Sequence, residues 1–171
     1  MADPTRTEQD DRLAVYLNDH LAGSAAAIRM LERHVDREPD SEFGMVMSDL
    51  LGEIRQDRAA LERVMERIGA SSSPGKHAGA LGAELLTTFR NKLPVLGAGS
   101  EDVARLEELE LLSLGIEGKR LLWRALETCA SANPKLTGVD FADLAERAES
   151  QRERLEPFRL RRAAAAFVPS P

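Results

Sequence analysis

Apolar residues recur every three or four positions along four long stretches of the chain, which is the spacing of one face of an α-helix. The first stretch runs from about Gln9 to the residues around Pro39. Its apolar positions are Leu13, Leu17, Leu21, Ile28, Leu31 and Val35. The second stretch begins at Ser41, a favoured N-cap, and ends at Gly69, a favoured C-terminal stop. Its apolar positions are Met47, Leu50, Ile54, Leu61, Val64 and Ile68.

The third and fourth stretches lie in the second half of the chain. The third runs from Ser100 to about Ser131, and the acidic residues after Ser100 favour a helix start. The fourth runs from about Asp140 to Phe167 and contains Pro157. An interior proline removes a hydrogen bond and clashes with the preceding turn, so we expect either a kink near residues 153–157 or a break there.

The connection over residues 70–100 is long for a simple hairpin. Residues 80–91 within it have the spacing of a short helix, so the connection can cross the bundle with a helix of its own. The pattern therefore predicts an all-α protein, an antiparallel four-helix bundle of ferritin-like topology with a long crossover between helices two and three. We expect residues 1–8 to form a disordered tail and residues 9–168 a single helical-bundle domain.

Each predicted helix carries polar residues near its middle, among the apolar positions. Mid-helix positions of an antiparallel bundle lie at one level, so we expect one polar layer across the core. Its candidate residues are Ser24, Asp57, Glu110, Glu117, Arg120, Arg147 and Gln151. In the expected arrangement Glu117 and Arg120 lie opposite Asp57 and Arg147.

This polar layer has two interpretations. Carboxylates that face inward from several helices can hold divalent metals or line a small-ligand pocket. Alternatively, the acids, the arginines and Gln151 form a buried, paired network that fixes the register of the helices and binds nothing. The second interpretation is favoured, because pairing alone satisfies the buried polar groups.

The composition excludes several classes of protein. A net charge of −6 argues against a general nucleic-acid binder, which needs a cationic field. No apolar run approaches the length of a membrane span, and the polar N-terminus does not resemble a secretory signal, so we expect a cytoplasmic protein. The single cysteine excludes a disulfide framework. We expect Cys129 to be a buried or half-buried inert thiol, and His34 and His77 to be solvated.

Four segments resemble known helical proteins. Tyr16–Ala27 (YLNDHLAGSAAA) and Glu53–Gly69 (EIRQDRAALERVMERIG) resemble the first and second helices of small bacterial ferritin-like proteins. Glu108–Leu126 (ELELLSLGIEGKRLLWRAL) and Arg147–Glu156 (RAESQRERLE) are similar to segments of an uncharacterised family of bacterial helical proteins. The resemblance spans about residues 10–167 and carries no assigned activity.

The chain departs from the ferritin-like enzymes at the residues that bind iron. Their di-iron site uses Glu-x-x-His motifs, and no such motif occurs here. Asp57 is the nearest match to the second-helix histidine, and Gly23 and Ser24 stand where such families place a first-helix glutamate. The resemblance therefore implies no ferroxidase or oxygen-activating centre, and we expect no cofactor.

We expect a non-enzymatic, soluble bundle with a structural or interaction role, in the form of a homodimer. The alternative function is binding of a divalent metal or small ligand at the polar layer. A third hypothesis is that Phe158–Phe167 (FRLRRAAAAF) docks on an acidic partner or on a second copy of the chain. The favoured interpretation of this segment is an ordinary fourth helix that covers the core.

Overall fold

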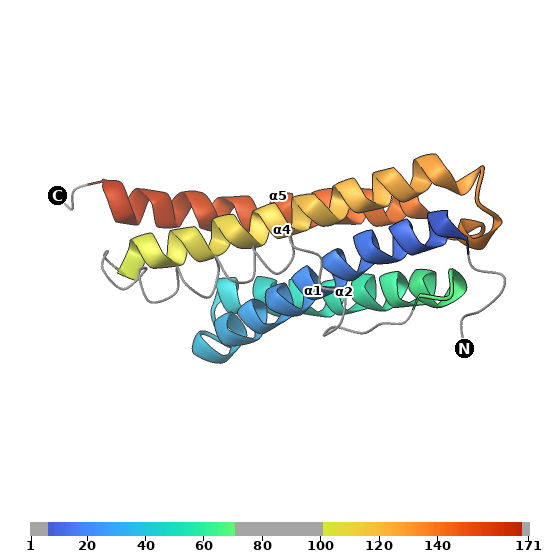
Figure 1. Cartoon of the computed structure of the whole chain (residues 1–171). Helices are drawn as coiled ribbons and strands as arrows, with labels where there is room; N and C mark the ends of the chain where they lie inside the picture. Colours follow the sequence, from blue (N-terminus) through green and yellow to red (C-terminus); the bar gives the residue numbers. More distant parts are fainter. Residues whose placement is uncertain (1–6, 71–100, 169–171) are drawn as a thin grey trace.

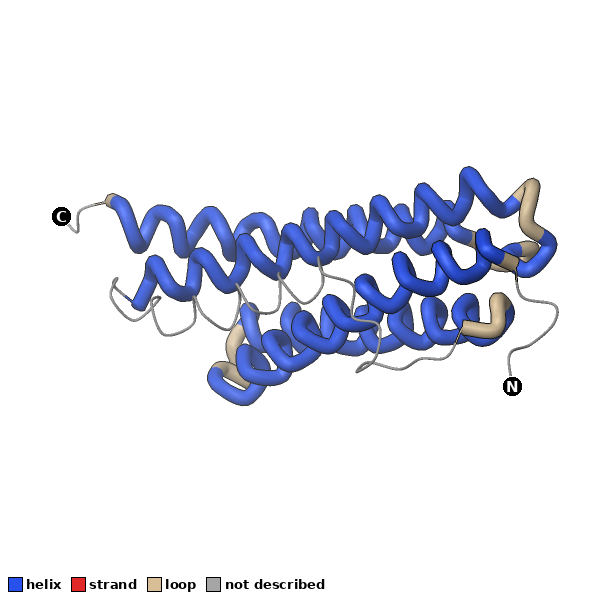
Figure 2. The backbone as a smooth tube through the Cα atoms, viewed as in Figure 1, coloured by secondary structure: helices blue, strands red, loops and turns tan. Residues whose placement is uncertain are grey.

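The computed structural model describes residues 7–70 and 101–168, and in these ranges the chain is all-α with no strand (Figures 1 and 2). The elements are α1 (Glu8–Arg37), α2 (Glu42–Arg67), α4 (Glu101–Ala130), the 3-10 helix η2 (Pro134–Leu136) and α5 (Phe141–Phe167). The predicted all-α class and the four predicted long helices are confirmed. The crossover and its short helix at residues 80–91 lie outside the described residues.

The capping residues Thr7 and Asp10 explain why α1 begins where it does. The Thr7 hydroxyl accepts a hydrogen bond from the Asp10 amide, and the Asp10 carboxylate accepts one from the Thr7 amide, which is a capping box. Asp10 also pairs with Lys135 of η2 at 2.7 Å, so the start of α1 is tied to the connection between α4 and α5. These contacts, the Lys135 contact first, lower the pKa of Asp10 to about 2.

Pro157 lies inside α5, which is a single helix from Phe141 to Phe167. Of the two expected outcomes, a kink or a break, the break is therefore absent. A proline removes one backbone hydrogen bond, whereas the buried side chains of Leu155 and Phe158 on either side of it pack into the same core cluster. Packing of the helix face thus outweighs the local cost of the proline.

The helices form two hairpins that face each other (Figure 1). Helices α1 and α2 pack together and run in opposite directions, as do α4 and α5. The hairpins meet mainly through α1 with α4 and α2 with α5. Helices α2 and α4 run in the same direction, from left to right in Figure 1.

The buried apolar residues form two separate clusters along the length of the molecule. The first cluster includes Leu17, Leu21, Leu61, Val64, Leu122, Trp123, Leu126, Phe141 and Leu144. The second includes Leu31, Met47, Leu50, Ile54, Leu109, Leu112, Ile116, Ala148 and Leu155. The change from one cluster to the other falls near the middle of α2 and α4, and between Ala145 and Ala148 in the first turns of α5. The candidate site lies at this boundary.

Candidate functional site

A buried polar network lies between the two apolar clusters. Helix α2 contributes Asp57, between Ile54 of one cluster and Leu61 of the other. Helix α5 contributes Gln151, and both side chains are inaccessible to solvent, with Asp57 only 1% exposed. Burial of a carboxylate is costly unless it is paired and hydrogen-bonded, so the partners of Asp57 decide what this site can do.

Both carboxylate oxygens of Asp57 are used by cations. Oδ2 accepts a hydrogen bond from Nζ of Lys119 on α4, and Oδ1 accepts one from Nη2 of Arg147 on α5. The side-chain amide of Gln151 donates a third bond to Oδ2 at 3.2 Å. Asp57 is therefore held from both α4 and α5, that is, by the hairpin to which it does not belong.

Gln151 connects this arrangement to a second carboxylate. Its Oε1 accepts from Lys119 Nζ, and its Nε2 donates to Oε2 of Glu53 at 3.0 Å. Glu53 lies one turn before Asp57 on α2 and also accepts from Nη2 of Arg154. We call the six side chains the Asp57 network: Glu53, Asp57, Lys119, Arg147, Gln151 and Arg154.

The electrostatics of the Asp57 network favour ion pairing over metal binding. Three cations face two carboxylates, and the carboxylate oxygens that point inward already accept hydrogen bonds. Burial lowers the pKa of Lys119, with Arg147 adding to the effect and the pairing with Asp57 opposing it. A divalent cation would have to displace Lys119 or Arg147 to reach Asp57. Among the described residues, no three His, Cys, Asp or Glu side chains are grouped to hold a metal ion.

The structure brings together three of the residues proposed from the sequence, namely Asp57, Arg147 and Gln151. Ser24 lies elsewhere, because its hydroxyl donates to the Leu21 carbonyl at 2.7 Å and accepts from Arg58 at 2.9 Å. It therefore joins α1 to α2 within one hairpin.

The proposed residues of α4 lie at the surface between α4 and α5. Glu117 pairs with Arg120 on the same helix at 2.7 Å, and Arg152 of α5 lies 3.0 Å from Glu117. Glu110 is 3.4 Å from Arg159. The expectation that Glu117 and Arg120 face Asp57 is thereby corrected. Successive helical residues are about 100° apart, so a small error in the assumed rotation of α4 selects a different side chain.

Lys119 is the member of the network on α4 that the sequence analysis missed. It lies three residues after Ile116 and three before Leu122, both of which are buried. That spacing places Lys119 on the buried face, so the signal was present in the sequence. Glu53 and Arg154 were also missed, and each lies one turn or less from a proposed residue of the layer.

Two further expectations about single residues are wrong. His34 is buried, with 4% exposure, because the start of α2 and the side of α4 cover the end of α1. Its ring lies edge-on to Phe43, and its Nε2 is 3.5 Å from Oε2 of Glu108. Cys129 is exposed near the end of α4. His77 lies outside the described residues.

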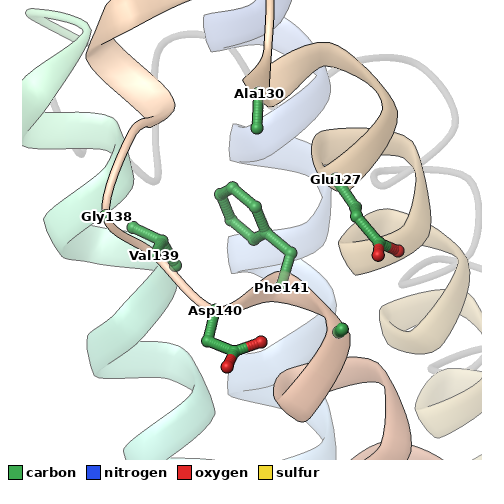
Figure 3. A pocket seen from close by; sticks show the side chains of 7 residues that line it. Glu127, Ala130, Gly138, Val139, Asp140 and Phe141 are labelled. Atoms are coloured by element: carbon green, nitrogen blue, oxygen red, sulfur yellow. The ribbon is translucent and has the colours of Figure 1, made fainter.

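A shallow cavity lies away from the Asp57 network. It has a volume of about 490 Å³ and occupies the junction between the end of α4 and the start of α5 (Figure 3). The Phe141 ring points toward Ala130 there, and Glu127 and Asp140 supply the carboxylates of the lining. Asp140 is already the N-cap of α5, accepting from the Asp143 amide at 3.0 Å. The cavity therefore presents no converging set of catalytic groups.

Comparisons with known proteins add no family to these observations: no family model matches the chain, and neither the curated proteins nor the solved structures contain a significant match. Within the described ranges, no helix is both long enough and apolar enough to cross a membrane.

Proposed function

We propose that the chain is a ferritin-like, antiparallel four-helix bundle with a structural or interaction role, acting in the cytoplasm without catalysis. The observation that carries this proposal is the occupation of both Asp57 oxygens by Lys119 and Arg147. At the level where a ferritin-like enzyme would present carboxylates and imidazoles to metals, this chain presents a carboxylate that is already paired.

The arrangement of the helices supports the same proposal. Helices α2 and α4 run in the same direction, which is the arrangement that a long crossover between them produces (Figure 1). The Asp57 network joins α2 to both helices of the other hairpin. Such a network specifies which faces of the hairpins meet, because any other register would leave Asp57 buried and unpaired.

Metal analysis tests the proposal against the alternative of a metal site in the polar layer. The full chain is purified without chelators, and its manganese, iron and zinc are measured before and after incubation with each metal. We expect less than stoichiometric metal, with the same content in the Asp57→Asn variant. Stoichiometric metal that is lost in Asp57→Asn but kept in the matched surface variant Glu117→Gln would overturn the proposal.

A further inference from the structure

Helix α4 carries an apolar stripe that begins at Leu111, which packs against the second apolar cluster, and continues along the exposed side of the helix. We call five positions with spacings of three, four, three and four the α4 stripe: Leu111, Leu114, Gly118, Leu121 and Ala125. Leu114 is 67% exposed and Leu121 is 54% exposed. Single exposed leucines are common, but two on one helical face with only small or apolar residues between them form a continuous strip. The stripe spans about 21 Å at 1.5 Å per residue.

Gly118 lies at the centre of the α4 stripe and is not required by packing within the described chain. A Cβ atom placed on it would meet no heavy atom of the described residues within 4 Å, and the same holds for Gly115. A glycine inside a helix costs about 1 kcal/mol relative to alanine. Gly23 and Gly52 are equally unconstrained, so a glycine alone decides nothing. Between Leu114 and Leu121, however, Gly118 leaves room for a second helix to approach closely.

Two charges beside the stripe, Glu110 and Arg124, favour a second copy of the chain as the occupant, although each also pairs within the chain, with Arg159 and Glu127 respectively. Glu110 and Arg124 lie on the same edge of the stripe, seven residues before and seven residues after Glu117. If a second copy of α4 packs antiparallel about a two-fold axis near Gly118, Glu110 of each copy meets Arg124 of the other. The same axis places Leu114 against Leu121 of the second copy. A parallel arrangement would place uncharged residues such as Gly115 and Cys129 opposite these charges.

We propose that two copies of the chain associate through the α4 stripe, antiparallel and with the two-fold axis near Gly118. The proposal rests on the interaction role given above and names the partner as a second copy of the chain. The pattern of charges and leucines along the stripe is self-complementary about Gly118, which is what a two-fold interface requires.

Molar mass measured by light scattering and sedimentation tests the interface. We expect a concentration-dependent dimer for the full chain, and a monomer for Leu114→Glu and for Leu121→Glu. Both leucines are exposed, so circular dichroism should show unchanged helix content. The matched control is Leu160→Glu on α5, where the leucine is 53% exposed. This control should remain dimeric. A monomeric full chain, or a dimer lost in Leu160→Glu but kept in the α4 variants, would overturn the proposal.

Cross-linking and charge exchange test the orientation of the two copies. In a Cys129→Ser background, Gly118→Cys should give a disulfide-linked dimer on mild oxidation, whereas Gly52→Cys, equally free of described contacts, should not. Glu110→Arg and Arg124→Glu should each weaken the dimer about three- to tenfold, and the double variant should recover it. Failure of the double variant to recover the dimer would contradict the antiparallel arrangement. None of these outcomes depends on metal content, so the inference can fail while the proposed function stands.

Discussion

Asp57 shows how one buried charge determines which side chains surround it. Its carboxylate is removed from water, and three hydrogen bonds from Lys119, Arg147 and Gln151 replace its hydration. The gain from such pairing is small in net free energy, because desolvation of the ions offsets much of it. Removing one partner is nevertheless costly, since the remaining charge stays buried. The Asp57 network therefore contributes more to the choice of helix pairing than to overall stability.

Substitution of Asp57 tests this account at a single residue. Asp57→Ala leaves Lys119 buried without its carboxylate, and we expect a loss of about 3–5 kcal/mol in the free energy of unfolding, measured with urea. The control Glu117→Ala removes the partly exposed pair with Arg120 and should cost about 1 kcal/mol or less. The double variant Asp57→Leu, Lys119→Leu should be more stable than Asp57→Ala. Equal losses in the two single variants would contradict the assigned role.

The sequence predicted the polar layer more reliably than the identity of its members. Asp57 and Gln151 were found because each replaces an apolar residue at a seam position of its helix. Lys119 was missed although its spacing from Ile116 and Leu122 fits the buried face. Long cationic side chains usually carry their charge to water, so a lysine among leucines is commonly assigned to the surface. The Asp57 carboxylate on the opposite hairpin and the Gln151 amide oxygen on α5 keep this one inside.

At the scale of elements, the turn between α1 and α2 depends on close approach of backbone. Glu38 is the C-cap of α1. Its carbonyl oxygen accepts hydrogen bonds from the Ser41 amide at 3.2 Å and from the Ser41 hydroxyl at 2.9 Å. The Ser41 hydroxyl in turn accepts from the Gly44 amide. A Cβ on Gly44 would lie 1.8 Å from the Glu38 oxygen. The turn therefore requires glycine at position 44.

Alanine substitutions at two glycines of α2 separate this requirement from helix propensity. Gly44→Ala must displace the backbone of the turn, and we expect the free energy of unfolding to fall by about 1–3 kcal/mol. Gly52→Ala meets no described atom within 4 Å and should gain up to about 1 kcal/mol. Thermal and urea unfolding of both variants provide the measurement. A stabilised Gly44→Ala variant would show that the turn can relax without cost.

For the molecule as a whole, helix positions were predictable and helix rotations were not. Periodicity and capping residues indicated the four long helices, because both signals are local in the sequence. The contacts between the hairpins change when a helix rotates by tens of degrees about its own axis. A row of apolar residues along the helix does not fix that rotation. His34 illustrates the difference: it looked solvated at a helix end, yet α2 and α4 converge on that end of α1 and bury it. Whether a residue at the end of a helix is buried thus depends on how the other helices pack around that end.

The burial of His34 makes the stability of the whole molecule depend on pH. Burial lowers the pKa of His34 below its ordinary 6.5, the nearby arginines, including Arg37 and Arg105, add to this effect, and Glu108 of α4 opposes it. Because the unfolded chain binds the proton at a higher pH than the folded chain, stability falls as the pH is lowered below the unfolded pKa. The loss continues until the pH reaches the folded pKa.

Unfolding by urea between about pH 7.5 and pH 5.5 measures this dependence, since it spans the ordinary histidine pKa. Burial also lowers the pKa of His20, so the comparison is made in a His20→Gln background. With His34 present, we expect the unfolding free energy to decrease toward pH 5.5. With His34→Gln added, the decrease should be smaller, because the substituted side chain does not titrate. Equal slopes in the two proteins would mean that His34 takes up its proton in the folded chain as easily as in the unfolded chain, and that the packing of α2 and α4 over this end of α1 opens in solution.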